Sequence, residues 1–173
     1  VHTESGRTAE QALYRAWPKK GTVLQNVLFP TNLVHQIEND FKPKELPCPA
    51  FFRLDLDEPG KSDLALQTLA EILADNPQAV VMVFVEVSNN AAGGHPVSVA
   101  HLREIKALLR PYAIPLVLDA TRILENASFL LAREPEPAGN DLWRVAREVL
   151  SCADTVVASL PKDFGINKGG LLA

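Results

Sequence analysis

Residues 114–122 read IPLVLDATR, and within this segment a short apolar run gives way to a polar turn. Residues 114–118 have the length and composition of a strand that is buried on both faces, as in a parallel sheet covered by helices. Apolar residues then recur at helical spacing over residues 120–131, which places Asp119 at a predicted strand-to-helix turn. Open α/β sheets bind ligands at such turns, outside the carboxyl ends of their strands.

The rest of the chain repeats this alternation of strand and helix. A helix is expected to begin at Ser5 or Thr8 and to end before Pro18, and another helix follows the sequence Phe29-Pro30. Residues 57–60 are expected to form a turn, and residues 134–140 an acidic loop rich in proline. We predict an α/β fold with three layers, in which a mostly parallel sheet lies between helices. The other predicted strands are residues 22–29, 50–56, 79–87 and 154–159, and the other predicted helices are residues 62–76 (capped by Ser62), 98–110 and 142–150.

Length and composition exclude several classes of protein. The 173 residues suffice for one domain, and a net charge of -4 with no basic cluster argues against a nucleic acid or membrane partner. The longest apolar run is too short to cross a bilayer, and Cys48 and Cys152 are too few for a disulfide framework, which suits the cytoplasm. Because the chain starts at Val1 and Met82 is its only methionine, we expect a piece of a longer polypeptide.

Chemically diverse side chains follow the predicted strands. Right-handed crossovers bring the carboxyl ends of parallel strands to one edge of a sheet, so these side chains should converge. Pyridoxal phosphate requires such a set: an amine, a carboxylate at its ring nitrogen, donors to its phenolate oxygen and a flat apolar surface. We assign Lys162 to the Schiff base, Asp119 to the ring nitrogen, Asn90 and Arg122 to the phenolate oxygen, and Phe29 to stacking.

The phosphate group of this cofactor needs a separate seat. A helix N-terminus with free backbone N–H groups and a nearby guanidinium favours an anion. We therefore expect Ser5, Gly6 and Arg7, together with Ser159, to bind the phosphate.

Each of these residues also has a simpler explanation when it is taken alone. Asp119 could cap a helix, Arg122 could form a surface ion pair and Lys162 could be a solvated loop residue. Their joint occurrence at several strand ends favours the cofactor. The histidines lack a metal-ligand spacing, so no metal is assigned to them: His2, His35, His95 and His101.

Several segments, in this order along the chain, form a recognisable set of motifs: SGRTAE at 5–10, FPT at 29–31, NAAGGHPVS at 90–98, DATR at 119–122, ENA at 125–127, SLPKD at 159–163 and NKGG at 167–170. They resemble the motifs of the tryptophanase and tyrosine phenol-lyase group of β-eliminating lyases. The resemblance implies the large, cofactor-binding domain of the aspartate-aminotransferase type over residues 1–173. It also implies that Lys162 is the Schiff-base lysine and that the backbone of Asn167 helps to bind a monovalent cation such as potassium.

The chain departs from that family at three positions. Pro161 stands where the family has a second lysine, Ser5 replaces a glutamine, and Pro30 replaces a threonine. The cofactor-binding set is retained while residues on the substrate side differ, so a different leaving group is plausible. The resemblance further implies a smaller C-terminal domain and preceding segments that this chain lacks. The chain could therefore retain the cofactor pocket and still lack catalysis. The longer parent protein is expected to be a homo-oligomer, either a dimer or a tetramer.

The sequence thus predicts a lyase that uses pyridoxal phosphate to catalyse β-elimination on a β-substituted amino acid, with cleavage of a carbon–carbon or carbon–sulfur bond. One alternative is a cysteine-type carbon–sulfur lyase domain of a larger biosynthetic protein. Another is a different pyridoxal phosphate reaction, such as transamination, because a fold does not fix the chemistry. A third is a scaffold module that binds no cofactor.

Overall fold

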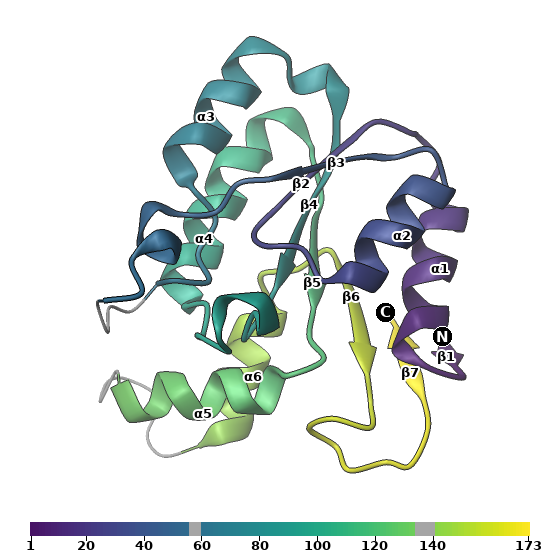
Figure 1. Ribbon diagram of the computed structural model, residues 1–173, viewed down its shortest axis with the longest axis vertical. Coiled ribbons are helices and arrows are strands. Elements are labelled where there is room, and N and C mark those ends of the chain that lie inside the picture. Colours follow the sequence, from purple (N-terminus) through teal and green to yellow (C-terminus); the bar gives the residue numbers. More distant parts are fainter. Residues whose placement is uncertain (56–59, 134–140) are drawn as a thin grey trace.

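A seven-stranded sheet forms the centre of the computed structural model, which describes residues 1–55, 60–133 and 141–173 (Figure 1). The strand order is β1-β7-β6-β5-β4-β2-β3. Strands β2 to β6 run parallel to one another, whereas β7 is antiparallel to both β6 and β1. The strands are β1 (His2–Thr3), β2 (Thr22–Gln25), β3 (Lys42–Glu45), β4 (Val80–Glu86), β5 (Leu116–Asp119), β6 (Thr155–Ser159) and β7 (Gly170–Leu172).

Helices cover both faces of the sheet, which confirms the predicted three-layer α/β/α arrangement with a mostly parallel sheet. Helices α1 and α2 lie on one face, and α3 to α6 lie on the other (Figure 1). In the described part of the chain, no helix is both long and apolar enough to cross a membrane. The helices are α1 (Gly6–Ala16), α2 (Pro30–Glu38), α3 (Leu66–Asp75), α4 (Val99–Leu109), α5 (Ile123–Arg133) and α6 (Leu142–Leu150), with 3-10 turns at Pro49–Phe52, Pro77–Ala79, Asn90–Ala92 and Arg110–Tyr112.

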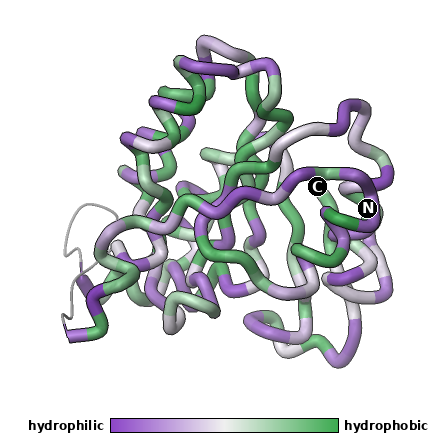
Figure 2. Tube along the Cα trace, turned by 45° about the horizontal axis from the view of Figure 1, so that its top comes forward, coloured by the Kyte–Doolittle hydropathy of each residue, from purple (hydrophilic) through white to green (hydrophobic). Residues whose placement is uncertain are grey.

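Strand β4 shows why the central strands are continuously apolar. All of its residues are buried, and alternate side chains point to opposite faces. Met82 and Phe84 pack with Tyr14 of α1, while Val83 and Val85 join the larger core under α3 to α6. Figure 2 shows the corresponding concentration of hydrophobic residues along the inner strands. A strand covered on both sides has no polar face, and this explains the run that the sequence displays.

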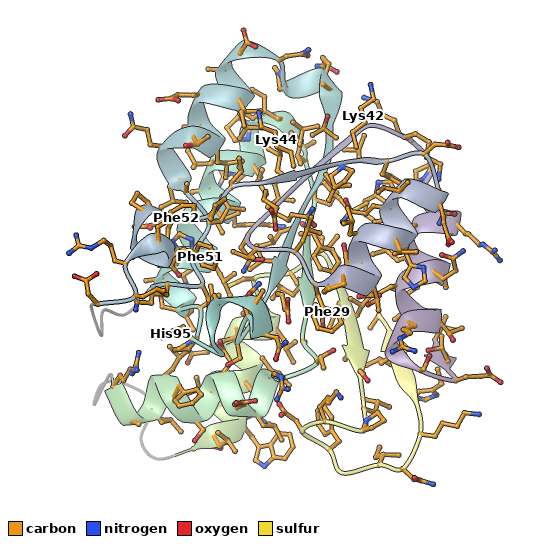
Figure 3. All side chains as sticks on the ribbon, in the orientation of Figure 1. Phe29, Lys42, Lys44, Phe51, Phe52 and His95 are labelled. Carbon is orange, nitrogen blue, oxygen red and sulfur yellow. The ribbon has the colours of Figure 1, made fainter. Side chains whose placement is uncertain are left out.

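One predicted strand is wrong. Of residues 50–56, those that are described include part of a 3-10 turn, Pro49–Phe52, and no strand. The strand in this region is β3, which has the charged sequence Lys-Pro-Lys-Glu. Among the described residues it pairs with β2 alone, at the edge of the sheet, and Figure 3 labels its exposed residues Lys42 and Lys44. An edge strand needs no apolar face on its open side and tolerates proline, so hydrophobic patterning did not reveal it.

Several predicted boundaries also differ from the structure. Strand β2 ends at Gln25, before residue 29, and α3 begins at Leu66 without a cap from Ser62. The Ser62 hydroxyl instead donates a hydrogen bond to the backbone oxygen of His95. Residues 57–59 of the predicted turn at 57–60, and the predicted loop at residues 134–140, lie outside the described residues. Both cysteines are free and buried.

Asn126 of α5 fixes the loop that follows β4. Its side chain is fully buried, and its Oδ1 accepts hydrogen bonds from the backbone N–H groups of Ser88, at 3.1 Å, and Val97, at 2.9 Å. Its Nδ2 donates to the backbone oxygen of Val97 at 3.1 Å. Both ends of the loop are therefore held against α5 by one amide, and this loop contains Asn90.

We expect the Asn126→Ala substitution to lower the free energy of unfolding by about 3 kcal/mol, because it leaves buried backbone groups without partners. Urea denaturation of the variant and the parent chain measures the loss. Gln67→Ala is the matched control, since it removes an exposed side-chain hydrogen bond to Glu71. Equal stability of the two variants would contradict the role given to Asn126.

Candidate functional site

A cavity of about 360 Å³ lies at the edge of the sheet where the parallel strands end. It lies between the turns that follow β4 and β5, the N-terminus of α1 and the segment after β6. Every residue predicted to bind the cofactor lines this cavity: Ser5, Gly6, Arg7, Phe29, Asn90, Asp119, Arg122, Ser159 and Lys162. The structure thus brings the predicted residues together, while their binding roles stay predictions.

Asp119 is the last residue of β5 and lies in register with Glu86, the last residue of β4. Residues in register on parallel neighbours point to the same face, so the two carboxyl groups lie close together. Asp119 Oδ1 accepts a hydrogen bond from the backbone N–H of Thr121 at 2.9 Å, and α5 begins only at Ile123. Asp119 keeps some surface open to the cavity, yet its position deep in the protein raises the pKa of its carboxyl.

Two further carboxyl groups line the cavity, and the sequence analysis did not identify them. Burial, followed by the charge of Asp119, raises the pKa of Glu86 to about 8 and the pKa of Glu10 to about 7. Glu86 accepts hydrogen bonds from the backbone N–H of Asn90 and the side chain of Asn89, each at 3.2 Å. This acidic end of the cavity favours a ligand that carries a positive charge or donates a hydrogen bond.

The other end of the cavity suits an anion. Ser5 caps α1, because its side chain accepts from Thr8 N at 3.2 Å and its carbonyl accepts from Ala9 N at 3.1 Å. The remaining amides of this first turn belong to Gly6 and Arg7, which both line the cavity. These amides, the helix dipole and the guanidinium of Arg7 together form an anion-binding arrangement.

Gly6 permits the close approach of α1 to β6. A Cβ atom at this position would lie 2.7 Å from Cβ of Ser159, which is too short for a normal contact. Glycine therefore lets the helix N-terminus and the end of β6 share one side of the cavity.

The remaining predicted residues come from separate turns. Phe29 precedes α2 and lies between that helix and the ends of β5 and β6 (Figure 3), with 37% of its surface exposed. Asn90 opens the 3-10 turn after β4, and Lys162 lies in the loop between β6 and β7. Arg122 Nη1 donates to Glu125 Oε2 at 2.8 Å, so this guanidinium lines the cavity while it is also held in an ion pair.

Asn167 is exposed and does not line the cavity, so its role in cation binding stays a prediction. Among the described residues, no group of three or more His, Cys, Asp or Glu side chains is arranged to hold a metal ion.

The cavity also contains residues that sequence reasoning missed. Glu86 follows the longest apolar run of the sequence, just as Asp119 follows the apolar run 114–118. This similarity could have identified Glu86 as a second carboxyl group at a strand end. Glu10 lies one turn along α1 from Gly6, so it could have been placed on the same side of that helix. The other missed lining residues are Thr31, Thr121 and Ala158.

Comparison with known proteins gives consistent matches over the whole chain. The model of the family described as beta-eliminating lyase matches residues 1–173. The tryptophanase of Salinibacter ruber is 35% identical over 100% of this chain and 37% of its own length. The tyrosine phenol-lyase of Pasteurella multocida is 32% identical over 99% of this chain and 38% of its own length. The chain thus spans less than half the length of these curated relatives.

A solved structure supports the fold independently. The Leishmania major threonine aldolase superimposes with a TM-score of 0.69 over 99% of this chain and 45% of that chain. At 16% sequence identity, this similarity concerns the fold alone.

The raised pKa of Glu86 makes the stability of the chain depend on pH. The folded chain keeps this proton up to about pH 8, whereas an unfolded glutamate loses it near its ordinary value of 4.5. Without a bound ligand, the folded chain should therefore lose stability as the pH rises through this interval.

We expect Glu86→Gln to remove much of this dependence. Relative to the parent chain, the variant should gain on the order of 2 kcal/mol in the free energy of unfolding between pH 5 and pH 8.5. Denaturation curves at both pH values measure the difference, and Glu71→Gln, at an exposed position, should show no such gain. If the free energy of unfolding changed equally between the two pH values in Glu86→Gln and in the parent chain, Glu86 would already be ionised at pH 5.

Proposed function

The chain belongs to the β-eliminating lyase family, and we propose that it is the cofactor-binding part of a lyase that uses pyridoxal 5'-phosphate. The proposed reaction is β-elimination on an amino acid that carries a leaving group on its β-carbon. The observation that carries this proposal is the gathering of an amine, a strand-end carboxyl and a helix N-terminus with an arginine around one cavity.

The two ends of the cavity fit the two ends of this cofactor. Asp119, beside Glu86, suits the protonated ring nitrogen, and the amides of Gly6 and Arg7 suit the phosphate. Phe29 offers an apolar surface to the ring. The cavity of about 360 Å³ is in the size range of small-molecule sites. Asn90 and Arg122 would bind the phenolate oxygen of the cofactor. Ser159 and the Arg7 guanidinium would bind its phosphate, and Lys162 would hold the cofactor covalently.

When bound, pyridoxal phosphate supplies an electron sink for the charge that develops at the α-carbon of the substrate. Asp119 supports this chemistry because its negative charge keeps a proton on the ring nitrogen in a site of low dielectric constant. Lys162 Nζ would hold the cofactor and, when its amine is free, would serve as the base that takes the α-proton of the substrate. Positioning and charge therefore come from the strand ends, and proton transfer comes from the loop after β6.

The leaving group can be carbon, as indole or phenol, or sulfur. Ser5 and Phe29 line the cavity, and Pro30 follows Phe29, so the positions that differ from the related lyases lie close to the proposed site. These differences leave the cysteine-type carbon–sulfur lyase as the alternative within the same mechanism.

Other properties of the whole protein belong to the same proposal. We propose a cytoplasmic homo-oligomer that binds an amino-acid substrate and a monovalent cation near the backbone of Asn167. These statements rest on the family resemblance, and gel filtration and activity assays of the full-length protein with and without potassium would test them.

The first test of the cofactor proposal is covalent attachment. The purified chain mixed with pyridoxal phosphate should give a visible absorption band, and borohydride reduction followed by peptide mapping should place the label on Lys162. Lys162→Ala should lose the label, whereas Lys168→Ala, in the same loop, should keep it. If neither this chain nor the full-length protein carries the label, the lyase proposal is wrong and a cofactor-free scaffold accounts for the fold.

A second test concerns the charge of Asp119. The Asp119→Asn variant keeps an oxygen for the Thr121 N–H but loses the negative charge, so we expect its Kd for pyridoxal phosphate to rise at least tenfold, or about 1.4 kcal/mol. Equilibrium dialysis measures the affinity. Asp154→Asn is the control, because Asp154 accepts a hydrogen bond from Leu116 N at the opposite end of β5. Equal affinities of the two variants would remove Asp119 from the cofactor site.

A further inference from the structure

The loop between β6 and β7, residues 160–169, brings Lys162 to the cavity but has few contacts of its own. Residues 161–168 are all exposed except Asp163. The backbone hydrogen bonds from Leu160 N to Gly169 O, at 3.1 Å, and from Gly165 N to Lys162 O, at 3.4 Å, both lie within the loop. They close the loop on itself, so the placement of Lys162 relative to the cavity depends on contacts with other segments.

Asp163 makes such a contact. Its Oδ2 accepts hydrogen bonds from the backbone N–H groups of Leu124, at 2.5 Å, and Glu125, at 3.2 Å. Both belong to the first turn of α5, where amides have no partner within the helix. Asp163 therefore caps α5 from a distant part of the chain, and the helix dipole favours its negative charge there. In the described part of the chain, these are the side-chain hydrogen bonds that join residues 160–168 to other segments.

A second connection lies just before the loop. Ser159 N donates to Thr121 Oγ1 at 2.9 Å, which ties the end of β6 to the turn after β5. Lys162 thus lies between two connections, one from Ser159 to the turn after β5 and one from Asp163 to the first turn of α5. Asp119, the last residue of β5, lies directly before the turn that follows this strand.

We propose that Asp163 is a positioning residue that holds Lys162 at the cavity by anchoring the loop to the N-terminus of α5. This inference rests on the proposed attachment of the cofactor to Lys162. When the cap is lost, the loop is held only at its ends, and the amine spends less time within reach of the aldehyde of the cofactor. The connection also fixes the distance between Lys162 and Asp119, which act on opposite parts of the same ligand.

The test compares Asp163→Ala with a matched control at another helix. Asp141 caps α6 in the same way, because its Oδ1 accepts from Trp143 N at 3.0 Å and from Arg144 N at 3.2 Å, but it does not line the cavity. Asp141→Ala therefore removes an equivalent cap away from Lys162. Asp163→Asn keeps an acceptor oxygen and serves as the conservative variant.

Two readouts are needed. The first is amide hydrogen exchange of residues 160–169 and of Leu124 and Glu125 without cofactor, which should speed up in Asp163→Ala alone. The second is the rate at which borohydride traps pyridoxal phosphate on Lys162, which should fall about five- to tenfold in that variant. Asp163→Asn should restore most of both signals, and Asp141→Ala should change neither.

Equal exchange and labelling in Asp163→Ala and Asp141→Ala would overturn the inference, since Asp163 would then be an ordinary helix cap. If neither the parent chain nor the full-length protein takes up the label, the proposed function fails, and the exchange data still decide whether Asp163 anchors the loop. Should Asp163→Ala not fold, Asp163→Glu keeps the charge but lengthens the connection. Slower labelling at normal stability would then support the inference, and unchanged labelling would overturn it.

Discussion

The carboxyl group of Asp119, surrounded by protein at the end of β5, is the constraint on which the rest of the site depends. Such a group is costly to ionise unless a positive partner or hydrogen-bond donors stabilise it. Here the N–H of Thr121 is the donor, while the charge of Asp119, after burial, helps to raise the pKa of the neighbouring Glu10 and Glu86. Ionising these carboxyl groups together is costly, so this end of the cavity favours a ligand that carries a positive charge or donates a hydrogen bond.

The fold holds these groups in place from both sides of the sheet. On one side, Tyr14 donates a hydrogen bond to Asn32 at 2.9 Å and accepts one from Gln36 at 3.1 Å. These hydrogen bonds join α1 to α2 beside Glu10. On the other side, Asn126 holds the loop after β4 against α5. Catalytic geometry is preserved when side chains sit on elements of this kind, because packed strands and helices move less than free loops.

Much of this architecture could be predicted from sequence because its signals are local. The change from strand to helix after Asp119 can be recognised from a few residues, and apolar runs indicate β4 and β5. Strand β3 could not be recognised, since a charged edge strand looks like a loop. The place of Glu10 at the cavity depends on how α1 packs against β6 through Gly6. Glu86 lies inside the predicted strand 79–87, whereas the sequence argument singles out residues at or beyond the ends of predicted strands. The contact between Asp163 and the first turn of α5 joins segments almost forty residues apart, and no sequence pattern within either segment predicts it.

Strand β3 also bears on how copies of this chain behave toward one another. The free edge of a sheet exposes unpaired backbone groups that can template a strand from a second molecule. Here that edge presents Lys42 and Lys44 to solvent, and Pro43 lacks the N–H that pairing would need. Charge repulsion and the missing donor make this border of the sheet a poor nucleus for fibrils. The same four residues that are too polar to look like a strand thus protect the folded chain from edge-to-edge aggregation.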